Sequence, residues 1–143
     1  MRENLKAVTV AVAIGLAAVG ATYAAGSASP SPFRVVWCLH LAYGLPLAIA
    51  AGVYAARIRR WIGRLALLLA GVLALWASFV FGVSEGFRAL QSMPDPPADA
   101  FADGGPMLGA LFLGWFPATL AVGLAYLASA LFRRHAHTAK PKA

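Results

Sequence analysis

Charged residues are scarce in this sequence, and they leave long gaps between them. Only 12% of the 143 residues are charged and 61% are hydrophobic, whereas soluble domains are about 25% charged and about 45–50% apolar. The four longest uncharged stretches follow Lys6, Arg34, Arg64 and Asp103 and contain 27, 22, 20 and 29 residues. Because a helix needs about 20 apolar residues to cross the hydrocarbon core, these stretches predict four membrane spans. Too little chain remains outside them for a separate soluble domain.

Motifs that would indicate a reaction are also lacking. The sequence has no phosphate-binding glycine loop, zinc-ligand spacing or serine nucleophile motif. The single cysteine, Cys38, cannot form an internal disulfide and is two positions from His40, so on a helix the two side chains diverge. His40 is the only histidine within an apolar run, which excludes haem held by two buried histidines. Asp95, Asp99 and Asp103 are interpreted as a solvated acidic loop. We therefore expect no enzyme activity, no cofactor and no metal site.

The apolar stretches predict an all-α fold, a four-helix transmembrane bundle with short turns and one longer outer loop. The expected segments of this single domain are helices over about 7–28, 33–56, 62–83 and 107–132, a loop over 84–106 and a basic tail over 133–143. Pro46 and Pro117 lie inside the second and fourth helices, where the missing N–H predicts kinks. For the first stretch a cleaved signal peptide is the alternative, since a basic start, an apolar centre and small residues follow one another.

Basic residues gather in the segments that would lie on one side of such a bundle. The side of the amino terminus holds ten of the twelve Lys and Arg residues: Arg2, Lys6, Arg57, Arg59, Arg60, Arg64, Arg133, Arg134, Lys140 and Lys142. The positive-inside rule then predicts a multi-pass protein of the cytoplasmic (inner) membrane, with both termini cytoplasmic and the 84–106 loop outside. The net charge of +7 is thus explained by orientation, and no nucleic acid partner is expected. We expect the tail to lie along the lipid headgroups without a fold of its own.

Small residues recur at every fourth position of the predicted spans. Two such rows are Gly44, Ala48, Gly52 and Ala56 in the second span, and Ala66, Ala70, Ala74, Ser78 and Gly82 in the third. A shorter row in the fourth span consists of Ala121, Ala125 and Ser129. Such rows allow membrane helices to approach closely. We expect them to pack helices within one chain, and the alternative is a face that forms a homo-oligomer.

His40 is the most distinctive polar residue of the spans. It follows Arg34 by six residues and therefore lies about 9 Å into its helix. Ionisable residues inside a membrane are by default functional hypotheses. We expect a candidate polar pocket formed by His40, Tyr43, Glu85 and Arg88, with Glu85 as the partner of His40. Two alternatives stay open: His40 as a packing residue satisfied by one hydrogen bond, and Glu85 paired with Arg88 three positions later.

These features favour a non-enzymatic accessory, assembly or scaffold component of a membrane complex. Its expected partners are the lipid bilayer and either another membrane protein or a second copy of the chain. The alternative is a small-solute or ion transporter or channel that acts as an oligomer, motivated by His40 and the two prolines. A channel needs a wetted polar path, and the spans offer little beyond His40, Thr22, Ser78, Thr119 and the tyrosines.

Overall fold

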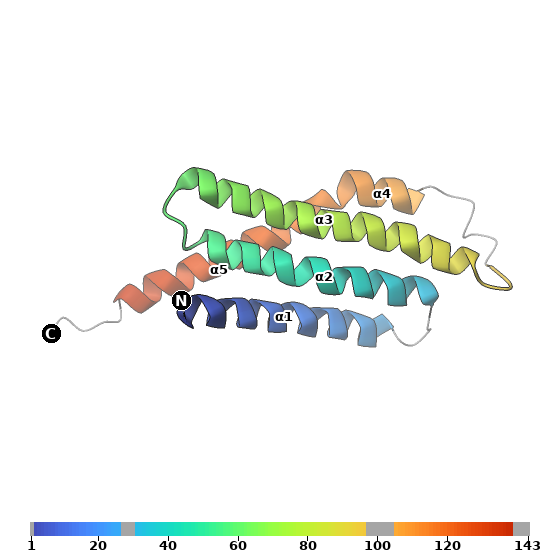
Figure 1. Cartoon of the computed structure of the whole chain (residues 1–143), viewed down its shortest axis with the longest axis horizontal. Helices are drawn as coiled ribbons and strands as arrows, with labels where there is room; N and C mark the ends of the chain where they lie inside the picture. Colours follow the sequence, from blue (N-terminus) through green and yellow to red (C-terminus); the bar gives the residue numbers. More distant parts are fainter. Residues whose placement is uncertain (1, 27–30, 97–104, 139–143) are drawn as a thin grey trace.

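A computed structural model of the protein describes residues 2–26, 31–96 and 105–138, all of which belong to helices or the turns next to them (Figure 1). The helices are α1 (Arg2–Gly26), α2 (Pro32–Ala55), α3 (Trp61–Gln91), α4 (Gly105–Leu113) and α5 (Trp115–Thr138). Three stretches are long and apolar enough to cross a membrane: Pro32–Ala55, Trp61–Gln91 and Trp115–His135. The all-α prediction is therefore confirmed for the described residues, and three spans indicate a membrane protein. In α1 the apolar stretch is shorter, Val12–Ala21, so the first expected span, over about 7–28, is not established.

α2 lies at the centre of the arrangement and contacts α1, α3 and α5 (Figure 1). Among the described helices, α1 packs against α2 alone. The two approach closely at Gly15, where a Cβ would lie 2.8 Å from Cγ of Pro46. α2 is one continuous helix through Pro46. The proline expected to kink the second span is therefore part of the surface on which α1 packs.

α2 and α3 run antiparallel and meet along glycines of α3. A Cβ at Gly82 would lie 2.7 Å from Cδ1 of Trp37, near the start of α2. A Cβ at Gly71 would lie 2.6 Å from Cβ of Ala51, near the end of α2. This register determines which side chains of the two helices lie at the same depth.

α3 extends beyond the apolar run, and the prediction of a loop beginning at residue 84 was wrong. Residues 84–91 form the last two turns of the helix. The ring of Phe33 on α2 lies against Gly86, where an added Cβ would be only 2.5 Å from Cδ2 of Phe33. The rings of Phe33 and Phe87 meet edge to face, with their centroids 5.4 Å apart. This packing continues past Glu85, which is the first charged residue after the apolar run of α3. Charge therefore marks where a helix leaves apolar surroundings, whereas its hydrogen bonding continues as long as a neighbour supports it.

The fourth predicted span consists of two helices, α4 and α5, separated at Gly114. Pro117 has no N–H, so the carbonyl of Leu113 loses its helical donor. Nearby, the indole Nε1 of Trp76 on α3 donates a hydrogen bond to the carbonyl oxygen of Leu111, 3.1 Å away. The kink expected at the proline is therefore a break in the helix, and a side chain of α3 bonds the backbone next to it.

α5 ends at Thr138, so the expectation of a tail without its own fold is wrong for residues 133–138. Residues 139–143 lie outside the described part of the chain. Nη1 of Arg133 donates a hydrogen bond to the carbonyl oxygen of Ala56, 2.8 Å away. This bond ties the last turns of α5 to the end of α2.

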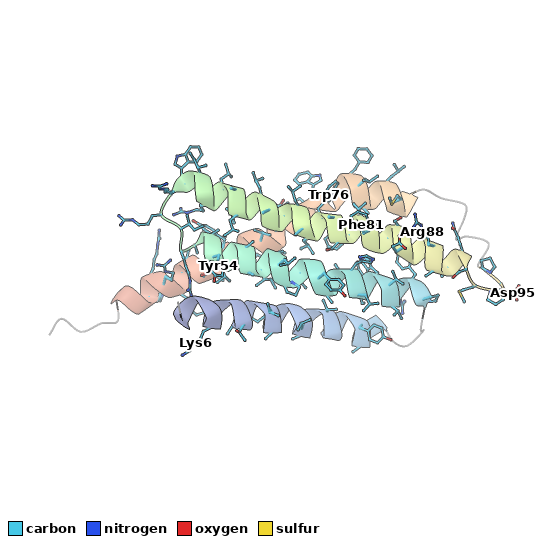
Figure 2. The ribbon with its side chains drawn as sticks, viewed as in Figure 1. Lys6, Tyr54, Trp76, Phe81, Arg88 and Asp95 are labelled. Atoms are coloured by element: carbon cyan, nitrogen blue, oxygen red, sulfur yellow. The ribbon has the colours of Figure 1, made fainter. Side chains whose placement is uncertain are left out.

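The charged residues divide between the two ends of the bundle. We call the start of α1, the turn between α2 and α3, and the last turns of α5 the basic end. Figure 2 shows Lys6 and Tyr54 near this end and Arg88 and Asp95 near the other. The described part of the chain therefore has the separation of charge that the sequence predicts.

Candidate functional site

His40, the centre of the predicted polar pocket, lies in the interface between α2 and α3. It is partly buried, and its Cβ lies 3.2 Å from the position that a Cβ would take at Gly82. The close approach is possible because Gly82 has no side chain. His40 therefore packs against the backbone of α3.

The other three residues of the predicted pocket do not gather around His40. Nη1 of Arg88 donates a hydrogen bond to Oε1 of Glu85, 2.9 Å away, and the two side chains are 73% and 42% exposed. In the described residues no hydrogen bond or ion pair joins Glu85 to His40. Tyr43 is 71% exposed and faces away from the bundle. The structure thus has the alternative pairing of Glu85 with Arg88.

The helix register explains this separation. Because Gly82 lies opposite both Trp37 and His40, the position opposite Glu85 lies between residues 34 and 37, three to six residues before His40. At 1.5 Å per residue this is about 4.5–9 Å along the helix. Sequence correctly places both groups in the same half of the molecule but cannot give the register.

The small row of α2 packs against two different neighbours. The row consists of Gly44, Ala48, Gly52 and Ala56, of which the first three are buried and the last is partly buried. A Cβ at Gly44 would collide with the hydroxyl of Ser78 on α3, and one at Gly52 would lie 2.6 Å from the carbonyl oxygen of Val122 on α5. Each four-residue step turns about 40° around a helix. The row therefore faces α3 at one end and α5 at the other.

The small row of α3 turns out of the interface for the same reason. Of its members, Ala66 and Ala70 are exposed, Ala74 and Ser78 are partly buried, and only Gly82 is buried. Four such steps turn the row by about 160°. The buried residues of α3 are instead Gly71, Leu75, Gly82 and Gly86. Their spacing of four, seven and four residues keeps them on one face, a signal that sequence reasoning missed.

Arg64 connects three elements at the basic end. Its Nη1 donates a hydrogen bond to the hydroxyl of Tyr126 on α5 at 3.2 Å, and its Nη2 donates to the carbonyl oxygen of Ile58 at 2.9 Å. The guanidinium carbon lies 5.9 Å from the centroid of the Tyr126 ring. Arg64 was recognised in the sequence only as part of a basic turn. Its structural role depends on α5 crossing the start of α3.

A groove lies between α1 and α5 at the basic end, with α2 as its floor, and its volume is about 880 Å³. Its walls are mostly apolar, and three cations line one end: Lys6 from α1, Arg57 from the turn after α2, and Arg133 from α5. Sequence reasoning missed this groove because it exists only where α1 and α5 both contact α2 but not each other. No group of three potential metal-ligating side chains occurs among the described residues.

Comparisons of the chain with protein-family models, with curated proteins and with solved structures return no match.

Proposed function

We propose that the protein is a non-enzymatic accessory or assembly component of a membrane complex, and that it acts through the outer faces of its helices. In this proposal four helices cross the cytoplasmic membrane as a bundle. The proposal follows mainly from one observation, the solid apolar core.

The centre of the bundle is filled by small and branched apolar side chains. Ala48, Leu75, Ala118 and Val122 are at most 1% exposed and come from three helices. Conduction or transport requires a wetted polar path through the protein. A core packed in this way leaves the surface of the monomer, rather than its interior, as the place of interaction.

Two of the hydroxyl groups that could have lined a path are bonded to their own helices. Oγ of Ser78 donates to the carbonyl oxygen of Ala74 at 2.9 Å, and Oγ1 of Thr119 donates to that of Trp115 at 2.8 Å. Such bonds satisfy the hydroxyl within its own helix. They support a role that needs no polar interior.

Several observations support α1 as a retained fourth span. It has 25 residues and is therefore about 37 Å long, which exceeds the about 30 Å of a hydrocarbon core. Val19 belongs to the buried core cluster and Gly15 packs on Pro46. A cleaved leader would not be expected to contribute to the core of the mature protein.

The charge distribution supports an orientation with the basic end in the cytoplasm. Arg57, Arg59, Arg60 and Arg64 lie at the turn between α2 and α3, and Trp61 beside them is 71% exposed. Basic residues favour the cytoplasmic side and tryptophan favours the interface. Both termini are then cytoplasmic.

Site-specific photocrosslinking in cells, followed by purification in mild detergent, tests this function. A photoreactive residue at Leu69 or Leu73, which are 53% and 58% exposed on α3, is expected to crosslink to one defined membrane protein that also co-purifies in stoichiometric amount. The matched control is the same residue at Leu75, which is 1% exposed and should give crosslinks only within the chain. The proposal is wrong if the protein purifies alone and carries a solute or ion across proteoliposome membranes.

A further inference from the structure

The groove between α1 and α5 has the length of one membrane leaflet. Its floor runs from Leu45 on α2 to Arg57 in the turn after α2, a distance of twelve residue steps, which is about 18 Å at the rise of a helix. Half of an about 30 Å hydrocarbon core is about 15 Å. The apolar part of the groove therefore has the depth of one leaflet, and its charged end lies at the level of that leaflet's headgroups.

The deep end of the groove closes where α1 meets α2. Gly15 brings α1 onto Pro46, one residue beyond Leu45. From this contact toward the basic end, α1 presents Ile14, Val10 and then Lys6 to the groove. These positions are four residues apart and so follow one side of the helix.

The α5 wall leaves room for a narrow apolar occupant. Small side chains line it, namely Ala121, Ala125, Ala128 and Ser129. Larger apolar groups stand at its edges, where Leu124 is 64% and Phe132 is 78% exposed. On the opposite wall Val10 and Ile14 are 57% and 55% exposed. A flexible hydrocarbon chain in the groove would contact all of these surfaces.

The basic end of the groove complements an anion. Lys6, Arg57 and Arg133 come from α1, the turn after α2, and α5, and none of the described lining residues is acidic. The bond from Arg133 to the carbonyl oxygen of Ala56 holds its guanidinium at the end of α2. A guanidinium carries five N–H donors, so this bond uses only part of its capacity. Arginine and lysine are the usual partners of phosphate groups.

We propose that the groove holds an anionic phospholipid, with one acyl chain between α1 and α5 and its phosphate against Lys6, Arg57 and Arg133. The proposal depends on the membrane location but not on the existence of a protein partner. The two proposals can be disproved separately: the lipid site does not require a protein partner, and the accessory role does not require a bound lipid.

Native mass spectrometry of the full chain in detergent tests the charge requirement. Dioleoyl phosphatidylglycerol and dioleoyl phosphatidylcholine are supplied in equal amounts, and the retained lipid is counted. We expect one phosphatidylglycerol to be retained in preference. The double variant Lys6→Gln/Arg133→Gln should lower that preference about 25-fold, about fivefold for each charge removed. The matched control, Arg59→Gln/Arg60→Gln, removes two exposed charges that do not line the groove and should retain the preference.

A second variant fills the groove without changing the charge. Ala128→Phe places a ring in the groove and should abolish retention of both lipids, whereas Ala66→Phe, at an exposed position on α3, should not. Gel filtration and circular dichroism establish that each variant is folded.

Three results would overturn the lipid site. Equal loss of preference in the groove and control double variants would indicate a general attraction of lipids to basic residues. Displacement of the retained lipid by inorganic phosphate would indicate a site for the free anion. A dimer that Ala128→Phe converts to monomer would show that a second copy of the chain fills the groove.

Discussion

The guanidinium of Arg64 on α3 donates a hydrogen bond to the phenol oxygen of Tyr126 on α5, 3.2 Å away, and lies beside the same ring. The contact joins residues that are 62 positions apart. It holds the middle of α5 against the start of α3, next to the groove.

Tyr126→Phe should destabilise the bundle, because it removes the hydroxyl and keeps the ring. Hydrogen bonds to charged groups contribute about 1.5–3 kcal/mol, and we expect about 1.5 kcal/mol for this partly exposed one. Thermal unfolding in detergent measures the change. Tyr43→Phe is the control, since Tyr43 is 71% exposed. Equal stability of Tyr126→Phe and the wild type would show that the bond contributes nothing.

Gly71→Ala should weaken the packing of α2 on α3. The added Cβ would lie 2.6 Å from Cβ of Ala51 and 3.3 Å from Cγ2 of Val122, so the helices must separate, at a cost of about 1–3 kcal/mol. Gly123→Ala is the matched control, because nothing lies within 4 Å of its Cβ position. Alanine is a better helix former than glycine by about 1 kcal/mol, so this control should be neutral or stabilising. A Gly71→Ala variant as stable as the wild type would refute the α2–α3 register.

Trp76→Phe should loosen the break between α4 and α5. The variant keeps an aromatic ring but loses the N–H that bonds the carbonyl oxygen of Leu111, which costs about 1 kcal/mol. Amide hydrogen exchange should become faster over residues 111–114 and stay unchanged in α2. Trp61→Phe, at a 71% exposed position, should change neither. Unchanged exchange in Trp76→Phe would mean that the break does not depend on α3.

His40 and Glu85 should behave as independent residues. Glu85 bonds Arg88, and His40 packs against Gly82. In a double-mutant cycle of His40→Leu and Glu85→Gln, we expect a coupling free energy below about 0.3 kcal/mol in thermal unfolding. Glu85→Gln and Arg88→Gln should be coupled by at most about 1 kcal/mol, as for exposed ion pairs. A strong coupling between His40 and Glu85 would restore the polar pocket that the sequence suggested.

The pattern of hydropathy predicts the cores of α2, α3 and α5 because each is a long run without charge. It fails at the helix ends. Residues 84–91 are helical because Phe33 packs against Gly86, a tertiary contact that no local pattern contains. The proline at 117 predicts a disturbance of the fourth span but not whether it bends or breaks.

The candidate sites were harder to predict because they depend on register and helix pairing. The spacing of Ala66 to Gly82 looks like one face, although four steps of about 40° carry it from exposed to buried positions. The groove lined by Lys6, Arg57 and Arg133 requires that α1 and α5 flank α2. Sequence placed these three cations on the same side of the membrane but could not bring them to one groove.

Cysteine accessibility is the most direct test of a four-span bundle whose basic end is in the cytoplasm. The only native cysteine, Cys38, is buried and is replaced by alanine. In this background, one residue at a time is replaced by cysteine: Asn4 in α1, Ser31 before α2, Arg59 before α3 or Asp95 after α3. We predict that Ser31→Cys and Asp95→Cys react with a membrane-impermeant maleimide added to intact cells, and that Asn4→Cys and Arg59→Cys react only after permeabilisation. Labelling of Asn4→Cys from outside, or its absence from the mature protein, would contradict a retained first span, and labelling of Arg59→Cys from outside would reverse the orientation.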